Sequence, residues 1–541
     1  MIDWAYADVW EQIAAAIPDR PAQIQADRTL TWREFDRRSN ALAAHLLRAG
    51  LQRQAKVGAF LFNAPEYLET YYAAFKAGLV PFNTNYRYGA EELTYLFDNA
   101  DAEAIVFHAE YAPLIDTIRA RLPRIQAWIA VAQSGHSIPD WAVDYETIAA
   151  PGAGRVAAPW GRSGEDQLFL YTGGTTGMPK AVMWRQDDLF NVLGAGGNLL
   201  LGIEPLTSAE EAGERAMAAT EPNLLLAAAP LMHGTSQFTA LGTLVTGGAV
   251  AVLPSNRFNA LELWDEVDRL KVNTMAIVGQ AFAAPMLEAL EANPGRWDTS
   301  SVRRIGSSGT VWNFENKQGL LRHIPGTILF DSLGSSEAVG LGASMSAAGQ
   351  TAETARFMVG PNSAVFTDDG RRVEPGSGER GLVATAGFVP VGYYKDPEKS
   401  AKTFRIYEGR RWSVPGDYAT VEVDGAMTLL GRGSQVINTG GEKVFPEEVE
   451  EALKRHPFVR DAVVVGVPDA RFGERVCAVV ELEPAAEGVT LEVLALHVRA
   501  QLADYKAPRA LVLAPVSRAP NGKVDYKASK ALAIEALKIS A

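Results

Sequence analysis

The chain has 541 residues, of which 47% are hydrophobic, 9% aromatic and 21% charged. This is ordinary globular usage, and it excludes disordered, collagen-like and coiled-coil proteins. With 51 Lys and Arg against 64 Asp and Glu, the net charge of -13 argues against a broad basic surface for nucleic acid or anionic lipid. The length predicts three or four domains, or one large composite enzyme with a smaller partner domain.

Cysteine content and hydropathy predict where the protein resides. Cys477 is the one cysteine, so we interpret it as a small apolar strand residue in a reducing compartment. The first residues lack a basic region before an apolar run, which argues against a secretory signal. No apolar run approaches the roughly 18 residues needed to cross a bilayer. We therefore predict a cytoplasmic protein without an integral membrane segment.

Helices and strands are expected to alternate through the first part of the chain. Thr31 and Glu34 have the spacing of a capping box, which predicts a helix ending near Gly50. Such alternation favours parallel sheets covered by helices, and it is expected to resume over 168–430, with a polar helical insertion at the surface over 204–222. The other early elements predicted from periodicity are a strand over 57–62, helices over 66–78 and 90–100, and a strand over 104–108.

The sequence changes in character after Gly431. Residues 432–541 hold 15 basic and 15 acidic residues, so the whole negative excess lies in residues 1–431. Pro446 suits the first turn of a helix that His456 and Pro457 end. We predict two domains that divide there: a large one of helix-covered α/β sheets, and a small α+β one. Strands over 463–467 and 476–482, a helix over 490–503 and a strand near 511 are expected in the small domain.

A Gly- and Thr-rich segment, residues 170–180, carries the first chemical signal. Three glycines free the backbone amides, three threonines supply hydroxyls and Lys180 adds a cation, which together suit a polyphosphate. It is not a Walker A loop, because the one Gly-Lys pair, Gly522-Lys523, is followed by valine. A flexible hairpin without a ligand is the alternative.

Several later groups could complete a nucleotide site. Glu337 follows glycine and serine hydroxyls, a setting that suits Mg²⁺ bound to substrate phosphates. Asp417 follows a tight turn and could accept from ribose hydroxyls, Arg432 adds a cation, and Lys523 stands on a turn near the end of the second domain. Taken singly, each could equally be a capping, linker or surface charge.

As an ordered set, these segments resemble the adenylate-forming superfamily of acyl-CoA synthetases, peptide-synthetase adenylation domains and firefly luciferase. The resemblance runs nearly end to end and includes residues 392–397 and 440–450. Through residues 230–235 and 440–446, the chain looks most like the acyl-CoA synthetases of fatty-acid and steroid side-chain breakdown. A hydrolase is disfavoured because no Gly-x-Ser-x-Gly elbow occurs, and a nicotinamide oxidoreductase because no Gly-x-Gly-x-x-Gly turn follows a predicted strand.

The resemblance implies a two-step reaction in which a carboxylate attacks ATP, releasing pyrophosphate, and the acyl-adenylate then passes to coenzyme A. The catalytic residues implied are Lys523, Thr176, Glu337 and His233, with Glu337 as the Mg²⁺ ligand. Lys523 would bridge the two anions during adenylation, and domain rotation would then withdraw it and present Gly440, Gly441, Glu442 and Lys443 for the thioester step. The implied ATP and AMP site consists of Thr172, Gly173, Gly174, Thr175, Thr176, Gly177, Lys180, Ser307, Ser308, Gly309, Asp331, Ser332, Gly334, Ser336, Asp417, Arg432 and Lys523.

The substrate is predicted to be an uncharged acyl group. Residues 231–238 offer no carboxylate to pair the ammonium of an amino acid. We expect His233, Gly279, Phe282 and Trp312 to line an apolar acyl pocket, although small residues also serve close helix packing and His233 could be structural. Free coenzyme A is the expected acceptor; transfer to a carrier protein, or release of the adenylate, is the alternative. The sequence leaves open whether the chain is a monomer or a homodimer.

Overall fold

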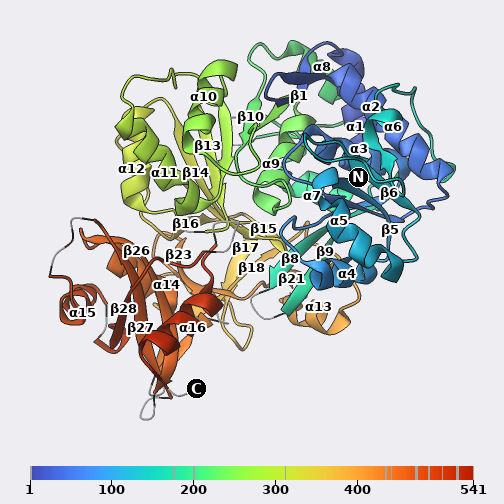
Figure 1. The fold of residues 1–541 in the computed structure, drawn as a ribbon. Helices are drawn as coiled ribbons and strands as arrows, with labels where there is room; N and C mark the ends of the chain where they lie inside the picture. Colours follow the sequence, from blue (N-terminus) through green and yellow to red (C-terminus); the bar gives the residue numbers. More distant parts are fainter. Residues whose placement is uncertain are drawn as a thin grey trace.

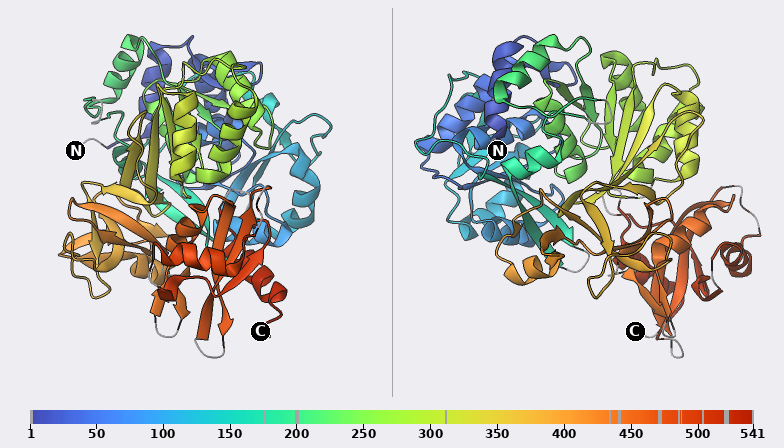
Figure 2. Two further views of the ribbon diagram at one scale, coloured as in Figure 1. Left: turned by 90° about the vertical axis from the view of Figure 1, so that its left-hand side faces the viewer. Right: turned by 180° about the vertical axis from the view of Figure 1, so that it is seen from behind.

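The computed structural model of the chain shows a large lobe and a smaller C-terminal lobe (Figure 1). Within the described residues the strands form three sheets of 8, 15 and 5 strands. The first two belong to the large lobe, and the third belongs to the small lobe, which projects to one side in the right-hand view of Figure 2. The structure describes residues 3–539 apart from 175–176, 199–201, 311, 433–434, 440–441, 470–472, 485, 487, 503 and 519–522.

The helices predicted near the N-terminus are confirmed, with their caps. Thr31 Oγ1 accepts from the Glu34 amide at 3.2 Å, and the Glu34 carboxylate accepts from the Thr31 amide at 2.8 Å. The helix expected over 66–78 starts at a proline and ends where Gly78 takes φ 63°, a conformation that glycine adopts without strain. The helices of this region are α1 (Tyr6–Ala16), α2 (Trp32–Arg48), α3 (Pro65–Ala77), α4 (Ala90–Asn99), α5 (Ala112–Ile118), α6 (Tyr145–Ala149) and α7 (Gln186–Val192).

The first sheet has the order β19-β9-β8-β4-β3-β5-β6-β7, and its strands from β8 to β7 run parallel. β8 and β9 form an antiparallel hairpin from the Gly/Thr-rich segment. The strands are β3 (Lys56–Phe60), β4 (Val80–Asn83), β5 (Ala102–His108), β6 (Ala127–Val131), β7 (Val143–Asp144), β8 (Gln167–Gly174), β9 (Gly177–Arg185) and β19 (Gly392–Tyr393).

The second sheet begins parallel and then changes, which corrects part of the sequence prediction. Parallel pairing holds from β1 through β14, apart from β2 at the edge, but the strands from β15 to β23 pair antiparallel. The reason is the short connections: β20 and β21, for example, are joined by two residues, whereas a parallel crossover needs a dozen or more. Of the helices, α9 (Gly234–Val245), α10 (Ala260–Leu270), α11 (Gly279–Ala292) and α12 (Phe314–His323) connect the parallel strands, and α13 (Pro397–Thr403) lies among the later ones.

The parallel part of the second sheet comprises β1 (Pro21–Gln25), β10 (Leu224–Ala227), β11 (Ala249–Val252), β12 (Thr274–Ile277), β13 (Arg304–Ser308) and β14 (Ile328–Ser335), with β2 (Arg28–Thr31) at its edge. The antiparallel part comprises β15 (Ala338–Ser346), β16 (Arg356–Val359), β17 (Ser363–Phe366), β18 (Arg380–Ala386), β20 (Phe404–Tyr407), β21 (Arg410–Ser413), β22 (Asp417–Val421) and β23 (Ala426–Arg432). No described helix is both long and apolar enough to span a bilayer.

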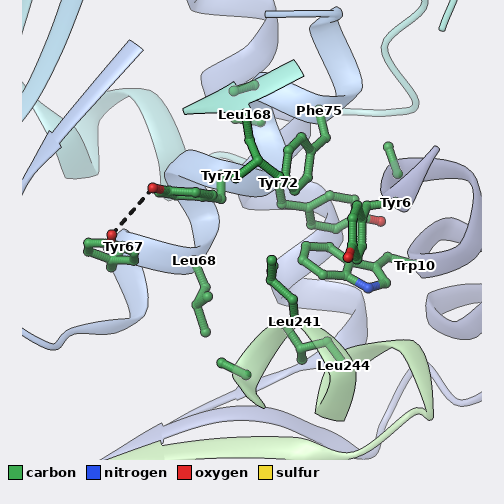
Figure 3. Close-up of a cluster of buried hydrophobic side chains, with 14 of the residues drawn as sticks. Tyr6, Trp10, Tyr67, Leu68, Tyr71, Tyr72, Phe75, Leu168, Leu241 and Leu244 are labelled. Carbon is green, nitrogen blue, oxygen red and sulfur yellow. Dashed lines mark hydrogen bonds between the residues drawn. The ribbon is translucent and has the colours of Figure 1, made fainter. Parts of the chain in front are cut away.

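An aromatic core holds α9 in place. Tyr6, Trp10 and Tyr72 are fully buried where α1 meets α3, and Figure 3 shows Leu241 and Leu244 of α9 beside them. Side chains of this size contribute about 1.5–3 kcal/mol each when buried. Gln237 of α9 also donates to the hydroxyls of Tyr67 and Tyr71 on α3, both at 2.8 Å. Burial and hydrogen bonds together hold α9 against α3.

The helical insertion expected over 204–222 is present as α8 (Ala209–Ala218), but one face of it is buried. Ala212, Gly213 and Ala216 face inward, and a Cβ on Gly213 would lie 2.9 Å from the carbonyl oxygen of Gln12 in α1. The Ala-rich composition, which from the sequence suggested a surface segment, therefore allows α8 to pack closely against α1.

The small lobe follows the sequence prediction. Pro446 starts its first helix, and Val449 and Leu453 are fully buried on one face. Cys477 is buried in a strand, as interpreted from the sequence. The boundary at residue 431 itself stays a prediction. The elements are β24 (Ile437–Thr439), β25 (Glu442–Val444), α14 (Pro446–Lys454), β26 (Val459–Asp469), β27 (Gly473–Leu482), α15 (Leu491–Arg499), β28 (Ala510–Leu513) and α16 (Tyr526–Ala536).

Candidate active site

A cavity of about 730 Å³ opens beyond the carboxyl ends of β13 and β14, the edge where open α/β sheets bind ligands. One end of it gathers residues that the sequence assigned to the nucleotide. These are Thr172 from β8, Ser307, Ser308 and Gly309 from β13 and its loop, Ser332, Gly334 and Ser336 from β14 and its turn, and Lys523 from the small lobe. The fold thus brings together segments more than 300 residues apart in the sequence.

Lys523 reaches the cavity from the small lobe. A Cβ built on Gly309 would lie 3.6 Å from Lys523 Cε, an ordinary contact distance, so the lysine side chain runs beside Gly309. Gly309 has φ +90°, where other residues are strained. Lys523 itself is exposed, which places it at an open part of the cavity.

His233 lies in the cavity wall directly before α9. Its Nε2 is buried and has no hydrogen-bond partner among the described residues. Burial, and then the positive charges of Lys523 and Arg87, lower the pKa of His233 to about 3. The imidazole is therefore neutral at physiological pH and faces the cavity as an uncharged group.

The β8–β9 hairpin places Lys180 beside a turn that follows β19. Lys180 forms an ion pair with Asp396, and this hydrogen bond holds the pKa of Asp396 below its usual value. Asp396 is itself fixed, because its carboxylate also accepts from the Lys399 amide at 2.9 Å as the cap of α13. Thr175 and Thr176, the latter expected to be catalytic, lie outside the described residues.

Glu337 is bound by Tyr393, which ends β19 directly before this turn. The Tyr393 hydroxyl donates to Glu337 Oε1 at 2.6 Å, and Ser413 Oγ donates to the Glu337 carbonyl oxygen at 2.5 Å. Tyr393 in turn pairs with Val182 of β9. Residues 393–396 therefore link the expected magnesium carboxylate to the expected phosphate lysine.

The donor set fits a magnesium ion shared with a substrate. The described residues contain no cluster of three or more His, Cys, Asp or Glu side chains that could hold a metal unaided. Mg²⁺ usually binds one or two carboxylates and fills its remaining positions with phosphate oxygens and water. Glu337, with one carboxylate oxygen engaged by Tyr393, could supply that single carboxylate.

The remaining nucleotide and thioester residues are described to different extents. Asp417 begins β22 directly opposite Arg432 at the end of β23, so the two expected ligands are neighbours in the ladder. The side chains of Arg432, Glu442 and Lys443 are not described, and the backbone of the last two forms part of β25. Gly440 and Gly441 fall outside the described residues.

Asp331 does not line the cavity, which corrects its expected place in the adenine pocket. Its side chain is buried and pairs with Lys317 at 3.1 Å. Burial raises the pKa of Asp331, and Lys317 opposes that rise. The difference has a tertiary cause, because Lys317 of α12 binds the Asp331 carboxylate away from the cavity, whereas the neighbouring Ser332 lines it.

The other end of the cavity follows α9. Thr235, Phe238, Thr239, Gly242 and Thr243 of this helix line it, which corresponds to roughly 12 Å of helix at about 1.5 Å per residue. A Cβ on Gly242 would meet nothing within 4 Å, so this glycine faces open space. The cavity therefore continues well beyond the nucleotide residues.

Only His233 of the four residues predicted for an acyl pocket lines this cavity. Gly279, Phe282 and Trp312 are buried instead, with the Phe282 ring 4.5 Å from that of Phe258. Their small and aromatic character reflects the packing of α11 against α10 and α12. The signal that could have found this wall of the cavity is the run of small residues along one face of α9, spaced by three or four.

A comparison with protein families assigns the fold. Residues 10–393 match the AMP-binding enzyme model, and residues 448–523 match that of the AMP-binding enzyme C-terminal domain. The chain belongs to the AMP-binding enzyme family. This confirms the resemblance inferred from the sequence.

Full-length relatives and a solved structure agree with this assignment. The enzyme is 41% identical to a 3-oxocholest-4-en-26-oate–CoA ligase of Rhodococcus rhodochrous, over 97% of the chain and 95% of the relative. It is 40% identical to a medium/long-chain-fatty-acid–CoA/3-oxocholest-4-en-26-oate–CoA ligase of Mycobacterium tuberculosis, with the same coverage. The fold matches that of the anthranilate CoA ligase AuaEII in complex with anthranoyl-AMP, with a TM-score of 0.85 at 21% identity, over 100% of this chain and 99% of that one.

In this AMP-binding enzyme, sequence reasoning missed Tyr393 and Asp396 as functional neighbours. Both stand in residues 392–397, which carried the resemblance but received no role. The available signal was a polar Tyr and Asp beside Gly392 in a short turn. Their partners, Glu337 and Lys180, are distant in sequence, so the pairing itself could not be predicted.

Proposed function

We propose that this enzyme is an ATP-dependent acid–CoA ligase for hydrophobic acids, either medium- and long-chain fatty acids or acids of steroid side chains. The acid and ATP give an acyl-adenylate and pyrophosphate, and coenzyme A then displaces AMP to give the thioester. The names of relatives about 40% identical over 97% of the chain support this substrate class.

The observation that carries the proposal is the continuity of the cavity. An acyl-adenylate has a polar half and an acyl half. The cavity likewise joins a polar end, with Thr172, Ser308 and Lys523, to an end that runs along α9 past Phe238 and Gly242. Its volume of about 730 Å³ lies within the range of small-molecule sites.

The polar end fits the adenylation step. Two anions, the substrate carboxylate and the α-phosphate, must approach each other, and the Lys523 ammonium offsets their repulsion and the charge of the transition state. His233 is neutral, so it lies in the same wall without competing for the carboxylate as a second cation. Glu337 would hold Mg²⁺, which would neutralise phosphate charge, while Lys180 and the β8–β9 hairpin bind the phosphates.

The second step requires Lys523 to leave, and the contacts between the lobes suit a movable domain. Arg460 of β26 pairs with Glu288 of α11 at 2.9 Å, but both side chains are largely exposed. Surface ion pairs of this kind contribute about 0–1 kcal/mol. Near the joint, the rings of Tyr418 and Phe445 are 5.6 Å apart. We propose that rotation about the joint brings residues 440–443 to the site for thioester formation.

The test is a balanced assay of both half-reactions. With ATP, Mg²⁺, coenzyme A and hexadecanoate, the purified enzyme is expected to form equal amounts of AMP, pyrophosphate and acyl-CoA. Without coenzyme A it should catalyse acid-dependent exchange of labelled pyrophosphate into ATP. Exchange without any thioester on addition of free coenzyme A would instead identify an enzyme that serves a carrier protein or releases the adenylate.

A further inference from the structure

The far end of the cavity contains a cation, Arg304, that no described residue binds. Arg304, the first residue of β13, is half-buried and lines the cavity. Its Nε is buried without a hydrogen-bond partner, and its guanidinium forms no hydrogen bond or ion pair with any described residue. Burying a donor without an acceptor is unfavourable, because the hydrogen bonds it made to water are lost and not replaced. Such a donor is therefore expected to find its acceptor in a ligand.

Strand geometry places Arg304 far from the reacting atoms. Arg304, Gly306 and Ser308 alternate along β13 and all line the cavity. Ser308 lies at the polar end, so Arg304 is four residues away, or roughly 13 Å along the strand. Gly306 keeps the path between them open, because a Cβ there would meet only the Met275 carbonyl oxygen, at 3.7 Å.

The neighbouring polar groups already have partners. Asn223 Oδ1 accepts from Thr274 Oγ1 at 2.6 Å, and Asn223 Nδ2 donates to Thr243 Oγ1 at 3.3 Å. The hydroxyls of Thr239 and Thr246 donate to backbone carbonyls of their own segment, at 2.7 and 2.9 Å. These donors are used within the protein, and the Arg304 guanidinium is left to face the cavity.

We infer that Arg304 recognises a carbonyl oxygen carried by the acyl substrate at the end opposite its carboxylate. This rests on the proposed function and deepens it: among the acids that the enzyme accepts, those with a distal ketone are preferred, such as one with the 3-oxo group opposite the 26-carboxylate in the substrate that two relatives are named for. A second carboxylate is disfavoured because Glu221 lines the same end of the cavity and would repel it. A neutral carbonyl accepts from the guanidinium without that repulsion.

The test compares 3-oxocholest-4-en-26-oate with cholest-4-en-26-oate, which lacks the ketone, in wild type, Arg304→Met, Arg304→Lys and the control Arg303→Met. Arg303 is exposed, and its guanidinium donates to the Ser300 carbonyl oxygen at 2.7 Å. Binding of each acid is measured by equilibrium dialysis without ATP, and kcat/KM is measured for each acid and for hexadecanoate.

Wild type and Arg303→Met are expected to prefer the keto acid by roughly 10- to 100-fold, the range for a hydrogen bond to a charged group. Arg304→Met should lose this preference while its activity on hexadecanoate stays within about two-fold, and Arg304→Lys should regain part of it. Equal binding of the two acids by wild type, no binding of either, or an unchanged preference in Arg304→Met would overturn the inference.

A different experimental result would refute the proposed function. If wild type forms no acyl-CoA from any acid, the ligase assignment is lost, whereas dialysis still decides whether Arg304 binds the ketone. Thermal unfolding of each variant, with hexadecanoate activity, separates loss of recognition from loss of the fold.

Discussion

The two ends of the cavity hold their polar side chains in opposite ways. Glu337 and Lys180 do not line the cavity themselves, but they adjoin Ser336 and Thr172 at its reacting end. Glu337 is bound by Tyr393 and Lys180 by Asp396, so both groups are oriented before a substrate arrives. At the far end, Arg304 has no partner among the described residues. Groups that take part in chemistry gain from preorganisation, because no reorganisation is then needed in the transition state. A group that only selects a substrate needs no protein partner, because the ligand itself supplies the acceptor for its hydrogen bond.

The largest effect should come from removing the movable cation at the reacting end. Lys523→Ala is expected to slow adenylation by roughly 10² to 10³, the usual cost of losing one group that stabilises developing charge. Thioester formation from a supplied acyl-adenylate should be nearly unchanged. The control is Lys527→Ala, an exposed lysine on α16. An equal loss of rate in both half-reactions would contradict the proposal that Lys523 leaves the site after adenylation.

The role of Glu337 can be tested directly and through the Tyr393 hydroxyl that donates to it. Glu337→Gln should raise the Mg²⁺ concentration needed for half-maximal adenylation strongly, because it removes the carboxylate charge. Tyr393→Phe removes the hydroxyl that donates to Glu337 but keeps the carboxylate charge, and it should raise this concentration by about 10-fold, as for other groups that orient a metal ligand. Titrating Mg²⁺ at saturating acid measures both. An unchanged requirement in Glu337→Gln would exclude a metal role.

Filling the cavity between its two ends should lower activity on long acids more than on short ones. Gly242→Leu would place a side chain in the open space beside α9, and we expect kcat/KM for hexadecanoate to fall by roughly 10-fold, the effect of one to two displaced methylenes. Activity on hexanoate should be retained, and Gly242→Ala should lie between the two. If both acids were affected equally, the acyl chain would not run along α9.

The smallest effect concerns the neutral imidazole between the ends. The pKa of His233 is about 3 in the folded state and about 6.5 when unfolded. Above pH 6.5 both states are neutral and no stability is lost, and as the pH falls from 6.5 toward 3 the unfolded state takes up the proton first. His233→Gln should therefore lose less stability than wild type on acidification, with a difference of about 1 kcal/mol at pH 5.5. Urea unfolding at pH 7.5 and 5.5 measures it, and parallel curves would contradict the buried, neutral state.

A comparison of particular residues shows how far the sequence could go. Lys523 and Thr172 were found from local composition and Ser308 from the family resemblance, and they meet in the cavity. Asp331 was misplaced because a motif does not show which residue of another element binds each side chain. Phe282 was misplaced because buried packing and a substrate wall use the same side chains. Arg304 gave no signal at all, since an arginine becomes unusual only where nothing pairs with it.

The sequence by itself determined the family, the order of the motifs and the capped helices, because these depend on short stretches whose chemistry is local. Only the tertiary structure decided that the later strands run antiparallel, that residues 393–396 hold Glu337 and Lys180, and that α9 and β13 form the wall of the cavity. Each of these depends on which distant segments pack together. Such pairing is set by the burial of whole helix and sheet faces, and no single segment encodes it.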